Sequence, residues 1–147
     1  MSEENQKPIG SGFGAKTPAA DVVKGMDLSS KNIIVTGGYS GIEEVRALAG
    51  VGAQITVPAR RPDAAKEALA EVDGQIEVAS MDLADLTSVR KFADDYVESG
   101  RQLDILINNA GSMACPLARV GPGWESQFGI NHLGHMALAQ GLLPALK

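Results

Sequence analysis

Apolar and polar positions alternate along the chain in blocks that predict strands and helices by turns. Four short apolar runs with the β-branched composition of strands lie at 32–36, 53–57, 75–79 and 103–107. Segments whose apolar residues recur every three or four positions follow them. This order predicts an α/β fold with a doubly wound parallel sheet. The run at 103–107 is almost continuously apolar, which is typical of a strand buried on both faces.

The connecting helices carry start and stop signals. Two are expected at 42–52 and 62–74, the second opened by a proline. The clearest helix is the one that Asp85 caps and Gly100 ends. Its apolar positions follow the i, i+3, i+4, i+7, i+8 pattern of one buried face: Val89, Phe92, Ala93, Tyr96 and Val97.

The last third of the chain predicts a long apolar helix. We expect it to start near Trp124, with Trp124 and Phe128 on one face as core anchors. Residues 126–146 contain no Asp, Glu, Lys or Arg, and the run is long enough to span a bilayer. It also holds Gln, Asn and His side chains, which hydrocarbon would leave unsatisfied. We therefore expect a buried helix of a soluble, cytoplasmic protein without a membrane partner.

The N-terminal part differs in composition from the rest. Residues 1–30 are predicted to form a tail with one short helix, ahead of a single domain at 31–147. Thr17 is the expected N-cap of that helix and Pro18 its first helical position. The segment Met1–Ser11 is polar and lacks an apolar core, so we do not expect a signal peptide.

Composition excludes several classes of protein. The 147 residues are 44% hydrophobic and 21% charged, which rules out a disordered chain and a collagen. The net charge of −5, without a basic cluster, disfavours a nucleic-acid partner. The single cysteine, Cys115, forms no intrachain bridge and fits a reducing compartment. No His, Lys or Arg follows Cys115 before Arg119, so no positive charge beside it would favour the reactive thiolate, and we expect Cys115 to be inert.

Glycine-rich and polar residues follow three of the predicted strands. The first strand runs through Thr36–Ile42, a glycine turn, directly into a helix, where backbone N–H groups can meet a pyrophosphate. Such a turn also occurs as an ordinary strand-to-helix connection, so both interpretations stay open on spacing alone. The pair Asp82–Leu83 and the run Asn108–Gly111 follow later strands. All three lie at carboxyl ends of parallel strands, where such sheets bind ligands.

In this order, the three motifs resemble those of the short-chain dehydrogenase/reductase family. The stretch from Phe128 to His135 looks like the next motif of the family, and the resemblance covers about residues 26–147. It implies a Rossmann-type fold, incomplete at the C-terminus, that binds a nicotinamide dinucleotide. It also implies subunit contact through the final helix, because the family forms dimers and tetramers. The pattern is closest to members that act on retinol-like or other lipophilic alcohols.

The resemblance implies a role for each matching residue. Gly37, Ser40, Gly41 and Ile42 would line the pyrophosphate, Asp82 would hold the adenine amino group, and Ala110 would touch the ribose. The remaining cofactor-binding positions would be Thr36, Leu83, Asn108 and Gly111. Asn131 would match the catalytic Asn of the family, which holds a water molecule in a proton relay.

The residues after the second strand bear on the choice of cofactor. NAD-binding folds usually place a carboxylate there for the ribose 2′-hydroxyl, whereas this chain has Arg60 and Arg61 and no acidic residue before Asp63. A guanidinium matches a 2′-phosphate in geometry and charge. The sequence thus favours NADP over NAD, with Arg60 as a binding residue; the alternative is that both arginines are solvated loop residues.

The glycine turn departs from the family pattern. The family has a third glycine after Gly41-Ile42, but this chain continues with Glu43 and Glu44, as if two residues were missing. Two residues correspond to ~3 Å of helix and a rotation of ~200°. We expect Glu43 to stand near the pyrophosphate position, where a like charge disfavours cofactor binding.

The family's acid/base pair is also absent from these residues. The family uses a Tyr with a Lys four residues later, which one helical turn brings together. Here Tyr39 is followed at that spacing by Glu43, and Tyr96 by Gly100. The sequence therefore predicts the cofactor-binding part of an oxidoreductase of alcohols or carbonyls, inactive by itself. The alternatives are a non-catalytic nucleotide-binding or interaction module and a truncated fragment.

Two further features complete the expectations. His132 and His135 lie at i, i+3, but without further ligands we expect packing or solvent roles and no metal. Without a fifth strand beside it, the strand at 103–107 would expose an apolar edge, namely Leu103, Ile105, Leu106 and Ile107.

Overall fold

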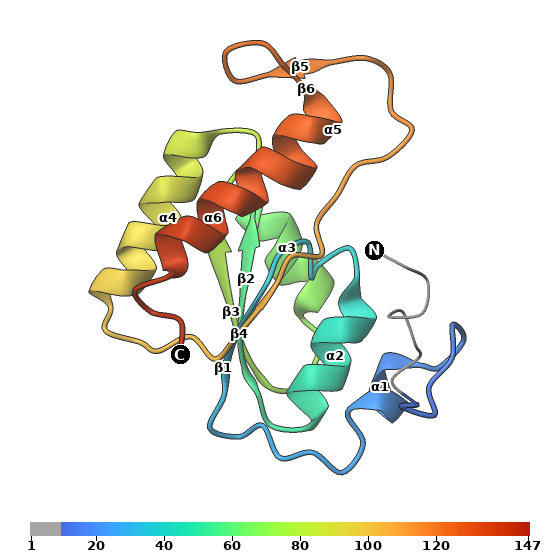
Figure 1. Ribbon diagram of the computed structural model, residues 1–147. Coiled ribbons are helices and arrows are strands. Elements are labelled where there is room, and N and C mark those ends of the chain that lie inside the picture. Colours follow the sequence, from blue (N-terminus) through green and yellow to red (C-terminus); the bar gives the residue numbers. More distant parts are fainter. Residues whose placement is uncertain (1–9) are drawn as a thin grey trace.

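Four parallel strands form the central sheet, in the order β3-β2-β1-β4 (Figure 1). A computed structural model describes residues 10–147. The strands are β1 (Asn32–Val35), β2 (Gln54–Ala59), β3 (Gln75–Ser80) and β4 (Ile105–Ile107). Ile33 in β1 is in register with Ile55 on one side and with Ile105 on the other. The strand order steps outward from β1 in both directions, which confirms the doubly wound α/β fold.

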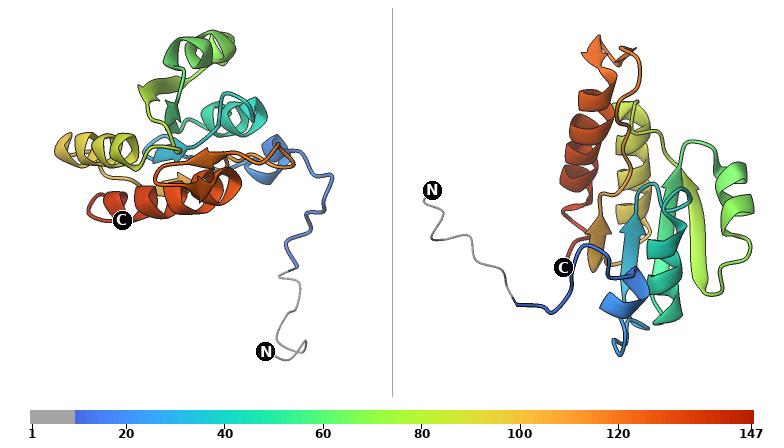
Figure 2. Two further views of the ribbon diagram at one scale, coloured as in Figure 1. Left: turned by 90° about the horizontal axis from the view of Figure 1, so that it is seen from above. Right: turned by 90° about the vertical axis from the view of Figure 1, so that its right-hand side faces the viewer.

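Helices cover both faces of the sheet and make three layers (Figure 2). On one face α2 (Ile42–Gly50) and α3 (Pro62–Leu69) pack against alternate residues of β1 and β2. On the other face α4 (Leu86–Glu98) and α6 (His135–Leu142) pack against Ile34 and Leu103. Strand side chains alternate between faces, so Ile33 and Val35 enter one core and Ile34 the other.

The expected cap of α4 is confirmed. The Asp85 carboxylate accepts a hydrogen bond from the Thr87 N–H at 2.8 Å, which satisfies one of the free donors of the first turn. At the other end the chain turns at Gly100, whose φ of 71° suits glycine.

The final helix begins at Ser126, near Trp124 as predicted, and a short strand precedes it. Residues Trp124–Glu125 form β6, which pairs antiparallel with β5 (Arg119–Val120). The helix starts at Ser126 because the Glu125 carboxylate accepts hydrogen bonds from the N–H groups of Gln127 and Phe128, both at 2.9 Å. These backbone hydrogen bonds, that of Gln127 first, hold the pKa of Glu125 below its ordinary value.

The final helix runs on through α5 (Ser126–Phe128), a π-helical segment η2 (Gly129–Gly134) and α6. It is buried on one face only, which corrects the prediction of a buried helix. Leu138 and Leu142 are fully buried, whereas Phe128 is 51% exposed and stacks on the His132 ring at 5.2 Å. Phe128 is therefore not a core anchor, and Trp124 is only half-buried. Within residues 10–147, no helix has both the length and the apolar character needed to cross a membrane.

The expected bare edge at Leu103 is wrong. Leu103 is fully buried, and a parallel bridge joins it to Leu146. Its N–H donates to the Ala145 carbonyl at 2.7 Å, and its carbonyl accepts from the Lys147 N–H at 3.0 Å. The last residues of the chain thus lie beside the start of this edge. The exposed part is β4 itself, where Ile105 is 37% exposed.

The short helix of the tail is α1 (Ala19–Val22), one residue later than predicted. Pro18 is its N-cap and not its first residue, because the Pro18 ψ of 147° is extended. The Thr17 hydroxyl accepts a hydrogen bond from the Gly14 N–H instead of capping the helix. Residues 1–9, and with them most of the segment assessed as a leader, lie outside the described residues.

Candidate functional site

The glycine turn after β1 is held tightly against the loop after β4. The Gly37 carbonyl accepts hydrogen bonds from the N–H groups of Ser40 at 2.9 Å and Gly41 at 3.1 Å. Gly37 has a φ of 69°, and a Cβ atom on it would lie 2.8 Å from the Ala110 Cα. Only glycine meets both conditions without strain, so this turn requires Gly37.

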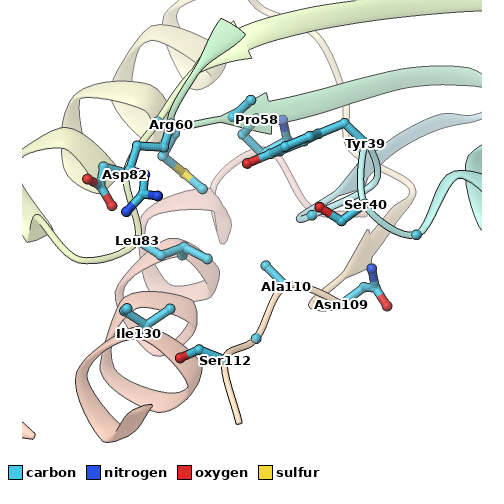
Figure 3. A pocket seen from close by; sticks show the side chains of 15 residues that line it. Tyr39, Ser40, Pro58, Arg60, Asp82, Leu83, Asn109, Ala110, Ser112 and Ile130 are labelled. Atoms are coloured by element: carbon cyan, nitrogen blue, oxygen red, sulfur yellow. The ribbon is translucent and has the colours of Figure 1, made fainter. Parts of the chain in front are cut away.

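A cavity of about 440 Å³ opens at the carboxyl ends of the strands (Figure 3). Its volume is in the range of small-molecule sites. Most of the residues predicted to bind a cofactor line it: Gly37, Ser40, Gly41, Arg60, Asp82, Leu83, Ala110 and Gly111. The structure thus brings together residues from the ends of all four strands.

Four predicted residues lie elsewhere. Asn108 and Asn131 line a neighbouring cavity of about 480 Å³, which Ala110 and Gly111 also border. Ile42 packs against the core beneath the turn. Thr36 is fully buried under the loop after β4.

Thr36 organises that loop from below. Its hydroxyl oxygen accepts hydrogen bonds from the N–H groups of Asn109 and Ala110, both at 3.0 Å. Its carbonyl accepts from the Asn109 side-chain amide at 3.3 Å. The contribution of Thr36 to the cavity is therefore the shape of the lining and not a direct contact.

Asn131 holds the next residues of the same loop from above. Its Nδ2 donates to the Ser112 carbonyl at 2.8 Å, and its Oδ1 accepts from the Ser112 N–H at 2.9 Å. The side chain thus pairs with the Ser112 backbone as a neighbouring strand would. Asn131 lies in η2, and π-helical turns are frequent at functional sites.

The two charged side chains of the cavity come from neighbouring strand ends. Arg60 follows β2, and Figure 3 shows it on the same side of the cavity as Asp82. Asp82 Oδ1 accepts from the Ala84 N–H at 2.9 Å, which fixes the carboxylate at the strand end. Arg61 is the N-cap of α3 and is not among the residues that line the cavity.

The model of the short chain dehydrogenase family matches residues 31–147. The chain belongs to the short-chain dehydrogenase/reductase family. It is 45% identical over 129 residues to a Streptomyces lividans protein named "Probable oxidoreductase", an alignment that covers 83% of this chain and 42% of the relative. Human retinol dehydrogenase 12 is 38% identical over 129 residues, covering 83% of this chain and 41% of that protein.

A solved structure agrees with the family assignment. Pseudomonas aeruginosa RhlG, determined as an active-site complex with NADP, superposes with a TM-score of 0.69 at 28% identity. The superposition covers 81% of this chain and 49% of that one. This member of the short-chain dehydrogenase/reductase family thus spans less than half the length of the curated relatives described above.

Glu44 and not Glu43 is the acidic residue beside the glycine turn. The Glu43 side chain is 77% exposed and lies 3.9 Å from Arg46. Glu44 Oε2 would be 2.8 Å from a Cβ on Gly41, and among the described residues it is a buried oxygen without a hydrogen-bond partner. The sequence prediction chose the wrong glutamate because one helical position turns a side chain by ~100°.

Several lining residues were not predicted from the sequence: Tyr39, Pro58, Ala59, Met81, Asn109, Ser112 and Ile130. Figure 3 shows the Tyr39 side chain reaching from the glycine turn toward Pro58. The position of Tyr39 inside the glycine turn was the sequence signal that could have identified it as a lining residue. Three of the others lie at or next to strand ends, namely Pro58, Ala59 and Met81. Because parallel sheets bind ligands at the carboxyl ends of their strands, their positions could also have been predicted. No sequence signal singles out Ile130, because the π-helical turn decides which way it faces.

Among the described residues, no three His, Cys, Asp or Glu side chains gather in a group that could hold a metal ion. His135 is buried, and His132 stacks on Phe128. Cys115 is free and exposed.

Proposed function

We propose that this domain binds NADP(H) in the 440 Å³ cavity, as the cofactor-binding part of an oxidoreductase that interconverts an alcohol and a carbonyl. The observation that best supports this proposal is the lining of the cavity, where the glycine turn, Arg60, Asp82 and Ala110 come together from the ends of four strands. Ligands of open parallel sheets bind at these ends. When bound, the nicotinamide supplies or accepts the hydride, and the protein binds and orients.

The lining residues fit a phosphorylated dinucleotide. Ser40 and Gly41 line the cavity just before the N-terminus of α2, where the helix dipole favours an anion. Arg60 would hold the 2′-phosphate and Asp82 the adenine amino group. RhlG, which was solved with NADP, supports the same cofactor.

The substrate class is part of the same proposal. Retinol dehydrogenase 12 is named for a lipophilic alcohol, and its likeness supports a lipophilic alcohol or carbonyl as substrate. Asn131, which lines the adjoining cavity, is the residue that we propose for the proton relay.

A second candidate is a nucleotide-binding module without catalysis. It is supported by the sequence, in which neither Tyr39 nor Tyr96 has a lysine four residues later. Both candidates share the cofactor site and differ only in turnover.

Calorimetric titration of the chain with NADPH and with NADH tests the cofactor site. We expect NADPH to bind more tightly and Arg60→Glu to remove that preference. A charged hydrogen bond contributes about 1.5–3 kcal/mol, so NADPH should weaken roughly 10- to 100-fold. Arg61→Glu is the matched control and should change little, since Arg61 lies outside the lining. Equal binding of both cofactors, or equal loss in the two variants, would contradict the assignment of Arg60.

A further inference from the structure

His135 is a buried side chain that links the two groups holding the loop after β4. It is 6% exposed and follows η2 as the first residue of α6. Its Nε2 lies 2.9 Å from the Thr36 hydroxyl oxygen, and its Nδ1 lies 2.9 Å from the Asn131 carbonyl oxygen. One ring therefore contacts both the Thr36 side chain and the Asn131 backbone.

The hydrogen bonds around Thr36 fix the direction of the first contact. The hydroxyl oxygen already accepts two N–H groups, from Asn109 and Ala110. A hydroxyl has two acceptor sites and one hydrogen, so toward His135 it can only donate. The other acceptor in reach, the Ile107 carbonyl, is at 3.4 Å and already accepts the N–H groups of Thr36 and Asn109.

The second contact then follows from the first. If Nε2 accepts the Thr36 hydroxyl hydrogen, the ring hydrogen of a neutral imidazole is on Nδ1. Nδ1–H then donates to the Asn131 carbonyl, which can only accept. The whole chain of hydrogen bonds has one consistent direction, from the loop amides through Thr36 and His135 to Asn131.

We propose that His135 is a positioning residue: as the Nδ1–H tautomer it holds the loop Asn108–Ser112 and Asn131 in one fixed arrangement. Thr36 fixes the front of this loop and the Asn131 side chain fixes Ser112. His135 hydrogen-bonds to both Thr36 and Asn131, so displacing either residue changes the hydrogen bonds of the other to the loop. The loop borders both cavities, and the inference rests on the proposed function only in its effect on NADPH affinity.

The tautomer is tested in the unsubstituted chain by long-range ¹H–¹⁵N NMR of the histidine rings. We expect the His135 spectrum of an Nδ1–H imidazole at neutral pH. A hydrogen on Nε2 would overturn the inference, because it would oppose the Thr36 hydroxyl. This measurement needs neither a variant nor a cofactor.

Amide hydrogen exchange tests the positioning role. In His135→Phe, which keeps a ring but no nitrogen, exchange should accelerate about five- to tenfold at Asn109, Ala110 and Ser112, the cost of one lost hydrogen bond. In His135→Asn a donor remains near the Nδ1 position, so protection should return at Ser112 but not at Asn109. His132→Phe is the matched control on the exposed side of the same helix and should change none of these amides. Exchange unchanged at Ser112 in His135→Phe, or faster only within the helix, would overturn the coupling.

Titration with NADPH separates this inference from the proposed function. We expect His135→Phe to weaken NADPH about fivefold and His132→Phe to leave it unchanged. If the unsubstituted chain binds no NADPH, the proposed function fails, while the tautomer and exchange results still decide the role of His135. If NADPH binds and its affinity is equal in both phenylalanine variants, the positioning role toward the cofactor site is wrong.

Discussion

Gly37 and Ala110 line the cavity so close together that a Cβ on Gly37 would stand 2.8 Å from the Ala110 Cα. Because Gly37 also has a φ of 69°, Gly37→Ala meets both backbone strain and a steric clash. We expect a loss of roughly 1–3 kcal/mol in the free energy of unfolding, and loss of NADPH binding. Urea denaturation and titration measure the two effects.

Gly50→Ala is the control for this substitution. Gly50 lies in α2, has open space around a Cβ and has no positive φ, so alanine should be neutral or slightly stabilising. Equal stability of the two variants would show that the turn and the loop move apart readily.

Glu44→Gln should tighten NADPH binding by about two- to tenfold. The substitution removes a negative charge beside Gly41 in a partly buried place, where charges act more strongly than in water. Glu43→Gln is the matched control, and its effect should be smaller because that side chain is 77% exposed. Weaker NADPH binding in Glu44→Gln would mean that the carboxylate supports the turn.

The 147-residue chain by itself should not turn over any alcohol or ketone with NADPH above background. Proton transfer by a positioned acid/base contributes ~10²–10⁴-fold, and no Tyr in the sequence has a Lys at the fourth position after it. The change in NADPH absorbance with time at saturating substrate measures the turnover. Turnover that persists through purification and disappears in Asn131→Ala would contradict the prediction.

Asp104 should make stability depend on acid pH. Its carboxylate accepts from the Asn32 N–H at 3.0 Å and from Lys31 Nζ at 2.9 Å, and these hydrogen bonds hold its pKa below the ordinary value. A folded-state pKa below that of the unfolded chain adds stability above the unfolded pKa, which is about 3.9 for Asp. That stability is lost as the pH falls through the folded pKa.

Urea denaturation of Asp104→Asn between neutral and acid pH tests the effect of this carboxylate. The unsubstituted chain should be more stable at neutral pH, and the difference should shrink as the pH falls below about 4. Asp95→Asn is the control, because Asp95 pairs with Lys91 on a helix face where both side chains are more than half exposed. A difference that is constant with pH would exclude Asp104 as the cause.

The isolated chain should associate through β4. Its residues form the outer strand of the sheet, and Ile105 is 37% exposed there. A lysine on an edge strand opposes pairing, so Ile105→Lys should reduce the mass measured by light scattering at tens of micromolar. Phe128→Lys removes an exposed apolar side chain on the final helix instead. If only Phe128→Lys reduces association, the helix face makes the contact and the edge prediction is wrong.

The fold could be predicted because it depends on local periodicity. Alternating strands and helices, the Asp85 cap and the turn glycines are properties of short windows, and the structure confirms them. The expected bare edge at Leu103 was wrong because it depends on a distant partner. Leu103 is buried by a bridge to Leu146, more than forty positions later, and no local pattern contains that pairing.

The candidate site was predictable where it follows from strand ends and less so where it follows from side-chain direction. Arg60, Asp82 and Ala110 converge because parallel strands end at one edge. The directions of the Glu44 and His135 side chains depend on where each residue falls around its helix, and a shift of one residue changes that direction by ~100°. For His135, the sequence offered only a spacing to His132, while its partners Thr36 and Asn131 come from separate elements.

The π-helical turn lets the final helix hold one extra residue without losing its packing. Hydrogen bonds from i to i+5 widen the turn, so η2 takes up about one residue more than an α-helix would use for the same rotation. Deleting one residue within Gly129–Gly134 would therefore restore an α-helix and leave Leu138 and Leu142 facing the core. The direction of the side chains within the segment would change, and Asn131 is one of them. The extra residue thus matters for the place of Asn131 and not for the packing of the helix beyond it.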